Sequence, residues 1–159
     1  MTGGGFTTCL WFDGQAEEAA NFYVSIFPSS KLGRTSRYSE AGPGEPGSVL
    51  AVEFELNGQK FVGVNGGPEF TFDEAISFQI HCDDQEEVDR YWSLLTEEGE
   101  ESVCGWLKDK FGVSWQVIPN GLVELISDPD SEKARRATEA MLSMVKLDIR
   151  AIERAHAGA

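Results

Sequence analysis

The sequence predicts an α+β fold made of two similar βαβββ modules and a C-terminal helical tail. First, the chain matches itself at an offset of 69 residues, so that 8–23 (TCLWFDGQAEEAANFY) lies over 77–92 (SFQIHCDDQEEVDRYW). Second, each stretch passes through a polar turn into an amphipathic helix, after which strand-like runs follow. Third, apolar residues recur at helical spacing in the segment 130–157.

The first module spans about residues 6–67 and begins with the strand of the repeat. Asn57-Gly58 predicts a two-residue hairpin turn, whereas 41–47 (AGPGEPG) has the composition of a loop. The elements expected after the first strand are a helix at about 16–27 and strands near 31–39, 49–56 and 60–65.

The second module spans about residues 74–127, and the helical tail about 130–157. Asp148 is a candidate cap for a short final helix. Because no long linker separates the modules, we expect residues 1–159 to form a single domain. The elements expected in the second module are a strand at 75–81, a helix near 85–97, and shorter runs near 102–107 and 113–118.

Composition and charge narrow the class of protein. The net charge of −14, from 27 acidic and 13 basic residues, argues against nucleic-acid binding, which requires clustered Lys and Arg. No apolar run approaches the roughly 20 residues that span a membrane, and the N-terminus lacks the pattern of a secretory signal. The three cysteines have no zinc-type or disulfide-framework spacing. We therefore expect a cytoplasmic protein with free thiols that binds neither nucleic acid nor membrane.

Three segments carry a resemblance to a known family: 10–23 (LWFDGQAEEAANFY), 61–68 (FVGVNGGP) and above all 104–117 (CGWLKDKFGVSWQV). They resemble the PhnB-like branch of the glyoxalase/bleomycin-resistance/dihydroxybiphenyl-dioxygenase, or vicinal-oxygen-chelate, superfamily. The resemblance covers about residues 7–156 and implies the βαβββ fold and a homodimer. Members often carry the label "3-demethylubiquinone-9 3-methyltransferase". A methyl donor is usually held by a Gly-rich turn between a parallel strand and a helix, and 63–67 (GVNGG) is expected instead to join antiparallel strands.

In the fold that this resemblance implies, a helix covers one face of each sheet and the other face curves around a cavity. Strand alternation then assigns side chains to the two faces. We expect Cys9, Trp11, Phe78, Ile80, Cys82, Val113, Trp115 and Val117 to face a helix, and Leu10, Phe12 and Gly63 to face the cavity. The predicted pocket lining is polar and comprises Thr8, Asn65, Ser77, Gln79, Trp106, Ser114 and Gln116.

Metal-dependent members hold a divalent ion through a His early in the first strand of each module and a Glu on its last strand. By this resemblance the His positions fall on Thr8 and Ser77, and the Glu positions fall on Gln116 and near Asn65. Hydroxyl and amide groups bind divalent transition metals far more weakly than imidazole or carboxylate. We therefore expect no metal and no other cofactor.

Two residues are candidates for catalysis. Glu53 alternates with apolar neighbours and would serve as a general base if its carboxylate were buried in the cavity; the alternative is a solvated acid at an exposed edge. Cys104 would serve as a nucleophile if a nearby cation lowered its pKa, and Lys108 and Lys110 are the nearest cations in sequence.

The sequence thus predicts a metal-free protein that binds a neutral polar or aromatic small molecule. Several alternatives stay open. They are a metal-dependent lyase, isomerase or dioxygenase with displaced ligands, a base-catalysed enzyme using Glu53, the methyltransferase of the family label, and a fold used only for assembly. Polar residues on the cavity side, such as Ser77 and Gln116, weigh against the last of these.

Overall fold

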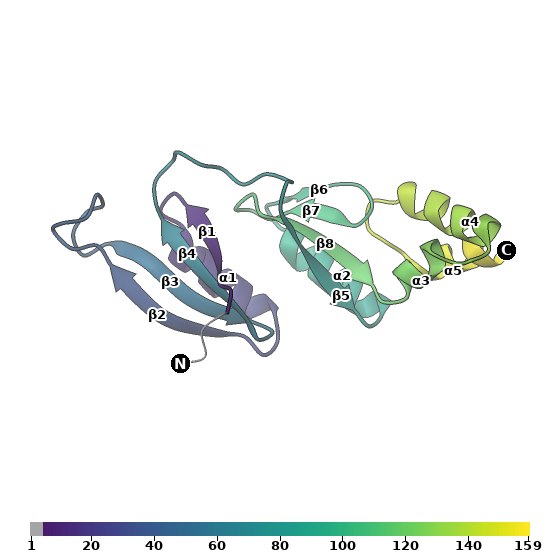
Figure 1. Cartoon of the computed structure of the whole chain (residues 1–159), viewed down its shortest axis with the longest axis horizontal. Helices are drawn as coiled ribbons and strands as arrows, with labels where there is room; N and C mark the ends of the chain where they lie inside the picture. Colours follow the sequence, from purple (N-terminus) through teal and green to yellow (C-terminus); the bar gives the residue numbers. More distant parts are fainter. Residues whose placement is uncertain (1–4) are drawn as a thin grey trace. The chain divides into compact units, whose positions relative to one another are not determined.

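A computed structural model describes residues 5–159. The chain forms two compact units, Met1–Phe72 and Asp73–Ala159, and each is described here by itself (Figure 1). The first unit holds the first module and the second unit holds the second module with the tail. The predicted α+β class, the two βαβββ modules and the helical tail are confirmed. The expected single domain over residues 1–159 stays a prediction.

The first unit contains one helix and a four-stranded sheet with strand order β1-β4-β3-β2. The pair β1/β4 is parallel, and the other pairs are antiparallel. At the hairpin between β3 and β4, Asn57 and Gly58 both have positive φ, at 49° and 84°, as a tight hairpin turn requires. The elements are β1 (Thr8–Phe12), α1 (Ala16–Ile26), β2 (Lys31–Arg37), β3 (Val49–Leu56) and β4 (Gln59–Asn65).

The second unit repeats this arrangement with strand order β5-β8-β7-β6. The pair β5/β8 is parallel, and the other pairs are antiparallel. Three helices follow the sheet, of which the first was not predicted as a separate helix. The elements are β5 (Ser77–Cys82), α2 (Gln85–Thr96), β6 (Glu100–Glu101), β7 (Trp106–Lys108), β8 (Ser114–Pro119), α3 (Leu122–Ile126), α4 (Ser131–Leu142) and α5 (Ile149–Ala157).

In each unit one helix covers one face of the sheet (Figure 1). The apolar face of α1 carries small residues, including Ala16 and Ala19, and the aromatic ring of Tyr23 stacks on Phe54 of β3. The buried face of α2 carries larger residues, Val88, Tyr91, Trp92 and Leu95. Burying such a face against a sheet is what stabilises a helix of this length.

The two helices begin differently. The side chain of Asp84 caps α2 by accepting a hydrogen bond from the backbone N–H of Glu87, as an N-cap carboxylate should. Helix α1 has no such local cap, and the side chain of Asn65, at the end of β4, accepts from the N–H of Ala16 at 2.9 Å. Asn65, from one of the family-like segments, therefore caps the start of α1 and does not point to the open side of the sheet.

The predicted facing of the first strand is wrong. Leu10 and Phe12 are buried on the helix side, with 6% and 3% of their surface exposed, whereas Cys9 is exposed. A Cβ on Gly63 would contact Ala16 of α1, so Gly63 also faces the helix. The cause is the link between strand and helix, which is residues 13–15 in the first module and only 83–84 in the second. A slip of one residue turns every side chain of a strand to the other face.

In the second module the predicted facing agrees with the structure. Ile80, Cys82, Trp115 and Val117 are buried on the helix side, and Phe78 packs against Trp115 with ring centroids 5.3 Å apart. The polar alternates of β5 and β8 lie on the opposite face.

The tail packs on the end of this sheet and has a small core of its own. Its buried residues are Leu122, Ala137, Leu147 and Ile152, and Ile118 of β8 packs against them. Asp148 caps α5, as predicted, by accepting from the N–H of Ala151. Over residues 5–159, no helix is both long enough and apolar enough to cross a membrane.

One side chain ties the tail to α2. The amide of Gln85 donates to the backbone oxygen of Leu147 at 2.9 Å and accepts from the N–H of Ile149 at 3.1 Å. Lys146 adds an ion pair with Asp89 at 2.6 Å.

Candidate functional site

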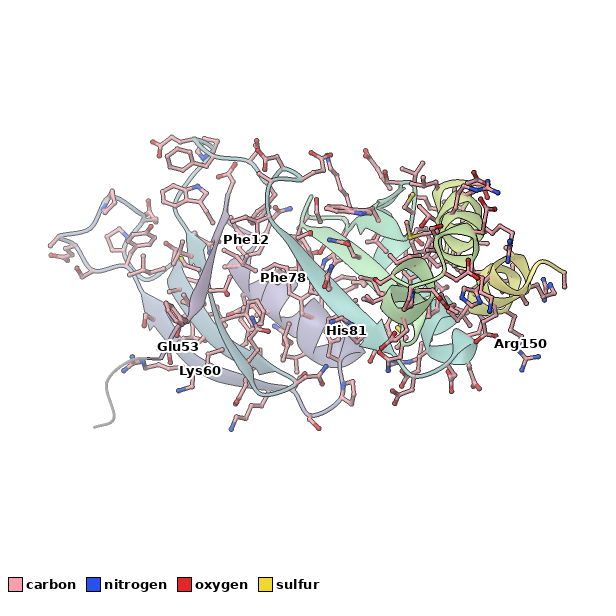
Figure 2. All side chains as sticks on the ribbon, turned by 45° about the vertical axis from the view of Figure 1, so that its right-hand side comes forward. Phe12, Glu53, Lys60, Phe78, His81 and Arg150 are labelled. Carbon is pink, nitrogen blue, oxygen red and sulfur yellow. The ribbon has the colours of Figure 1, made fainter. Side chains whose placement is uncertain are left out.

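The face of the second sheet opposite α2, here called the open face, gathers most of the predicted pocket residues. Strand pairing places Gln116 beside Gln79 on one side and beside Trp106 on the other. Ser77 lies beside Ser114 in the same way. His81 lies further along β5, on the same side as Gln79, and Phe78 points to the other side of the strand (Figure 2).

Three of these side chains form one hydrogen-bonded line, here called the amide row: Ser77, Gln79 and Gln116. The Nε2 of Gln79 donates to the Oε1 of Gln116 at 3.3 Å, and the Nε2 of Gln116 donates to the Oγ of Ser77 at 2.8 Å. Ser77 and Gln116 are half-buried and Gln79 is exposed. Each member fixes the rotamer of its neighbour, so the row is held in one arrangement before any ligand arrives.

At one end of the amide row the chain leading into β5 covers the face. Ser114 is 1% exposed, and its hydroxyl donates to the backbone oxygen of Asp73 at 3.4 Å. Lys108 forms an ion pair with Glu74 at 2.6 Å. Hydrogen bonding to Lys108 lowers the pKa of the Glu74 carboxyl, and the same contact raises the pKa of the Lys108 ammonium. Trp106, Lys108 and Ser114 line a small hollow of about 110 Å³ here.

Asp109, within the most family-like segment, has a structural position. It is 3% exposed, and its Oδ1 accepts from the backbone N–H groups of Phe111 and Val113 while its Oδ2 accepts from the indole of Trp115 at 2.8 Å. A buried carboxylate with three donors fixes the turn between β7 and β8. Asp109 therefore holds the strands that carry the amide row and lies on the covered side of it.

The residues present do not fit the divalent metal that the superfamily resemblance implies. Ser77 and Gln116, at two of the ligand positions, are neutral and hydrogen-bonded to each other, so an N–H points at the oxygen that would have to coordinate. Such metals are held in most sites by carboxylate oxygen, imidazole nitrogen or thiolate sulfur. Within residues 5–159, no group of three His, Cys, Asp or Glu is placed to hold a metal ion.

The open face of the first sheet is charged. Glu53 pairs with Arg34 at 3.3 Å, and Glu55 pairs with Lys31 at 3.2 Å. Together with Lys60, these acids border a hollow of about 380 Å³, and Figure 2 shows Glu53 and Lys60 close together. The Glu53 side chain is 50% exposed and paired with a guanidinium. The predicted role depended on a carboxylate buried in the cavity, and Glu53 instead matches the alternative of a solvated acid.

The remaining predicted site residues lie elsewhere. Thr8 pairs with Phe61 and is half-buried toward the helix-covered side, so its predicted orientation toward the cavity is wrong. The side chain of Asn65 is directed to Ala16 and to the backbone oxygen of Val49. Asn65 does border a hollow of about 450 Å³, but this one lies at the start of α1, beside Tyr38 and Asp13.

Cys104 lies in the loop between β6 and β7, in a left-handed conformation with φ of 56°. Its backbone N–H donates to the oxygen of Met144, and the next residue, Gly105, donates to Val145. The cations nearest in sequence are engaged elsewhere, since Lys108 pairs with Glu74 and Lys110 with Glu98. The backbone of Cys104 thus holds the tail against the loop, and both lysines that the sequence offered as partners of its thiol are paired with carboxylates.

Residues of the open faces that the sequence analysis missed include Lys108, Thr7 and Lys60. Lys108 follows Trp106 by two residues, so strand alternation was sufficient to find it. Thr7 and Lys60 border the hollow of the first sheet. Thr7 can be identified as an open-face residue only when the one-residue slip of the first strand is known, because Thr7 then corresponds to Ser77 of the second module.

Comparison with known proteins agrees with this geometry. The sequence profile of the 3-demethylubiquinone-9 3-methyltransferase family matches residues 4–118. The PhnB protein of Bacillus cereus is 40% identical, with a TM-score of 0.67 over 73% of this chain and 99% of that one. The fosfomycin resistance protein FosX of Listeria monocytogenes, at 16% identity, has a TM-score of 0.55 over 78% of this chain and 97% of its own.

Protein PA1353 of Pseudomonas aeruginosa, at 18% identity, has a TM-score of 0.59 over 72% of this chain and 96% of its own. At such identities these two similarities establish the fold alone. No curated protein matches the chain. The profile match and the Bacillus cereus relative agree with the sequence resemblance, and the chain belongs to the 3-demethylubiquinone-9 3-methyltransferase, or PhnB-like, family.

Proposed function

We propose that this protein binds a small, uncharged organic molecule on the open face of the second sheet, without a metal ion. The observation that carries the proposal is the amide row, in which Gln79, Gln116 and Ser77 are hydrogen-bonded in series. Neutral amides and hydroxyls orient a ligand by hydrogen bonds, and they neither transfer protons near neutral pH nor attract ions.

The neighbours of the amide row favour a ligand-binding surface rather than an ordinary solvent-exposed sheet face. Trp106 lies next to Gln116 on β7 and is half-buried, so it offers a flat apolar surface beside the polar groups. The open face of the first sheet shows the alternative, where Lys, Arg, and Glu side chains pair with one another across strands.

Methyl transfer receives no support from the glycines of the family-like segment. Gly63 lies inside β4, paired with both β1 and β3, and leaves room for Ala16 and Phe12. Gly66 lies against the ring of Trp11, where a Cβ would collide with the indole. Both glycines serve close packing, and neither opens a turn that leads from a parallel strand into a helix.

The proposal includes two further expectations, a homodimer and a cytoplasmic location. Family resemblance supports the first. The second agrees with three cysteines in no disulfide-framework pattern and with the acidic composition. Size-exclusion chromatography with light scattering tests the first: a single species of about 35 kDa, twice the 17.5 kDa chain, is expected, and a monomer at micromolar concentration would contradict it.

The binding function is tested by screening neutral small molecules against the full chain by NMR, with and without EDTA. Compounds that bind are expected to bind equally well in both conditions and to lose binding in Gln116→Ala. Gln59→Ala is the matched control, because Gln59 is an exposed glutamine at the start of β4, on the other sheet. Binding that requires added Mn²⁺ or Zn²⁺, or that survives Gln116→Ala, would overturn the proposal.

A further inference from the structure

We infer that the ligand of the amide row presents a neutral amide edge, a carbonyl oxygen beside an N–H, as carboxamides, lactams and imides do. This inference rests on the proposed binding function and adds the chemical class of the ligand. It follows from which donors and acceptors of the row its own hydrogen bonds leave unused.

One end of the row is left with donors. The Oγ of Ser77 accepts from Gln116, so the hydroxyl proton of Ser77 points elsewhere and is available to donate. Gln116 uses one N–H on Ser77 and uses its Oε1 to accept from Gln79, which leaves its second N–H. Among residues 5–159, no other side-chain hydrogen bond engages these groups. A ligand oxygen placed here meets two donors.

The other end keeps an unused acceptor. Gln79 donates one N–H to Gln116, keeps its second N–H, and its Oε1 accepts no hydrogen bond from the part of the chain that the structure describes. Gln79 and Ser77 are alternate residues of β5, so both side chains stand on the same face about 7 Å apart. A ligand whose oxygen meets Ser77 and Gln116 while its N–H meets Gln79 satisfies both ends together.

The charge of the surrounding groups narrows the chemical class of the ligand further. All three members of the row are neutral, and the nearest charged groups toward Ser114, Lys108 and Glu74, neutralise each other at 2.6 Å. An ionic ligand would lose hydration without gaining an opposite charge, which is unfavourable.

Three probes of nearly equal size and shape test this class: benzamide, benzoate and benzamidinium, with charges of 0, −1 and +1. Each is titrated into the ¹⁵N-labelled full chain, and the side-chain amide signals of Gln79 and Gln116 are followed by NMR. Benzamide is expected to shift both signals with a Kd about tenfold or more below that of either ion, because each ion leaves one hydrogen bond of the row unmet.

A single substitution should reverse the order. Gln116→Glu keeps the side chain's size but replaces its two N–H donors with an acceptor-only carboxylate, so benzamidinium should become the preferred probe. Gln79→Glu gives a second variant at an exposed position, where the new charge costs little folding stability. Gln59→Glu is the control with the same charge change on the first sheet, and it should keep the order of the wild type.

Each result decides the inference. Benzamidinium or benzoate binding first to the wild type, equal binding of all three, or an unchanged order in both Gln116→Glu and Gln79→Glu would overturn the amide class. If other neutral compounds still lose binding in Gln116→Ala, the binding function stands without it. If no compound of any kind shifts the Gln79 and Gln116 signals, the proposed function fails as well.

Discussion

The two sheets of this protein have the same strand order and the same helix-covered architecture, yet their open faces differ in chemistry. The first sheet carries cross-strand ion pairs, Arg34 with Glu53 and Lys31 with Glu55. The second carries the neutral amide row beside Trp106. Packing against a helix restricts one face of each sheet to apolar residues, whereas the opposite face is free to vary, and there the two sheets differ in chemistry.

A second difference is the link between the first strand and the helix. It is one residue longer in the first module. A constant offset of 69 predicts that Cys9 and Cys82 both face a helix, whereas in the structure they have opposite orientations. Cys9 is exposed and Cys82 is fully buried.

The two thiols therefore give the largest expected difference. Burial raises the pKa of the Cys82 thiol from 9.0 to about 12, so its thiolate fraction at pH 8 falls about a thousandfold. In native protein at pH 8, iodoacetamide should alkylate Cys9 at least about a thousand times faster than Cys82, as measured by mass spectrometry of tryptic peptides. Unfolding in urea is the control, because both should then react alike. Equal native rates would mean that the one-residue slip does not exist.

The turns before the last strands also differ, and Asp109→Ala should break the second one. The substitution leaves the N–H groups of Phe111 and Val113 and the indole of Trp115 without this acceptor. We expect a loss of about 3 to 5 kcal/mol in the free energy of unfolding, measured by urea denaturation with fluorescence. Asp109→Asn keeps an acceptor for the backbone and should lose about half as much. A loss below about 1 kcal/mol would show that the turn holds without the carboxylate.

In the first module the corresponding turn depends on backbone conformation instead. Gly58 has a φ of 84° and open space around its Cα, so Gly58→Ala brings strain without a clash. A loss of about 1 to 2 kcal/mol is expected, measured in the same way. Gly5→Ala is the control, because Gly5 also has open space but no positive φ, and it should change nothing. Equal effects from the two substitutions would refute the turn assignment.

The smallest expected effect concerns the ion pair at the end of the amide row. Because Lys108 lowers the pKa of Glu74 below 4.5 in the folded protein, the pair contributes stability above pH 4.5, and that contribution disappears as the pH falls through the lowered pKa. In Lys108→Met the pKa of Glu74, followed by ¹³C NMR, should rise toward 4.5. Lys146→Met is the control, since it should raise the pKa of Asp89 instead. An unchanged Glu74 would show that the pair does not form in solution.

Most of the fold could be predicted from the sequence, because hydrophobic periodicity and turn residues such as Asn57-Gly58 are local signals. The facing of β5 and β8 followed from alternation alone. The facing of β1 could not be predicted in this way, because it depends on the length of the loop between β1 and α1. The offset of 69 that aligns the two helices misaligns the two strands by one residue.

The candidate site was predicted in part for the same reason. Ser77, Gln79 and Gln116 come from well-patterned strands, and their mutual hydrogen bonds are a consequence of pairing that no single segment reveals. Asn65 was misplaced because an amide that caps a helix from another element looks, in sequence, like any polar residue at a strand end.

The position of the tail has a practical consequence for choosing where to cut the gene. The family profile ends at residue 118, which is the Ile that packs on Leu122, Leu147 and Ile152. A shortened protein that stopped there would expose the apolar surface around Ile118 to solvent. It would also leave the Gln85 amide without the backbone groups it binds. Recombinant versions meant for ligand screening should therefore run at least to Ala157, the end of α5.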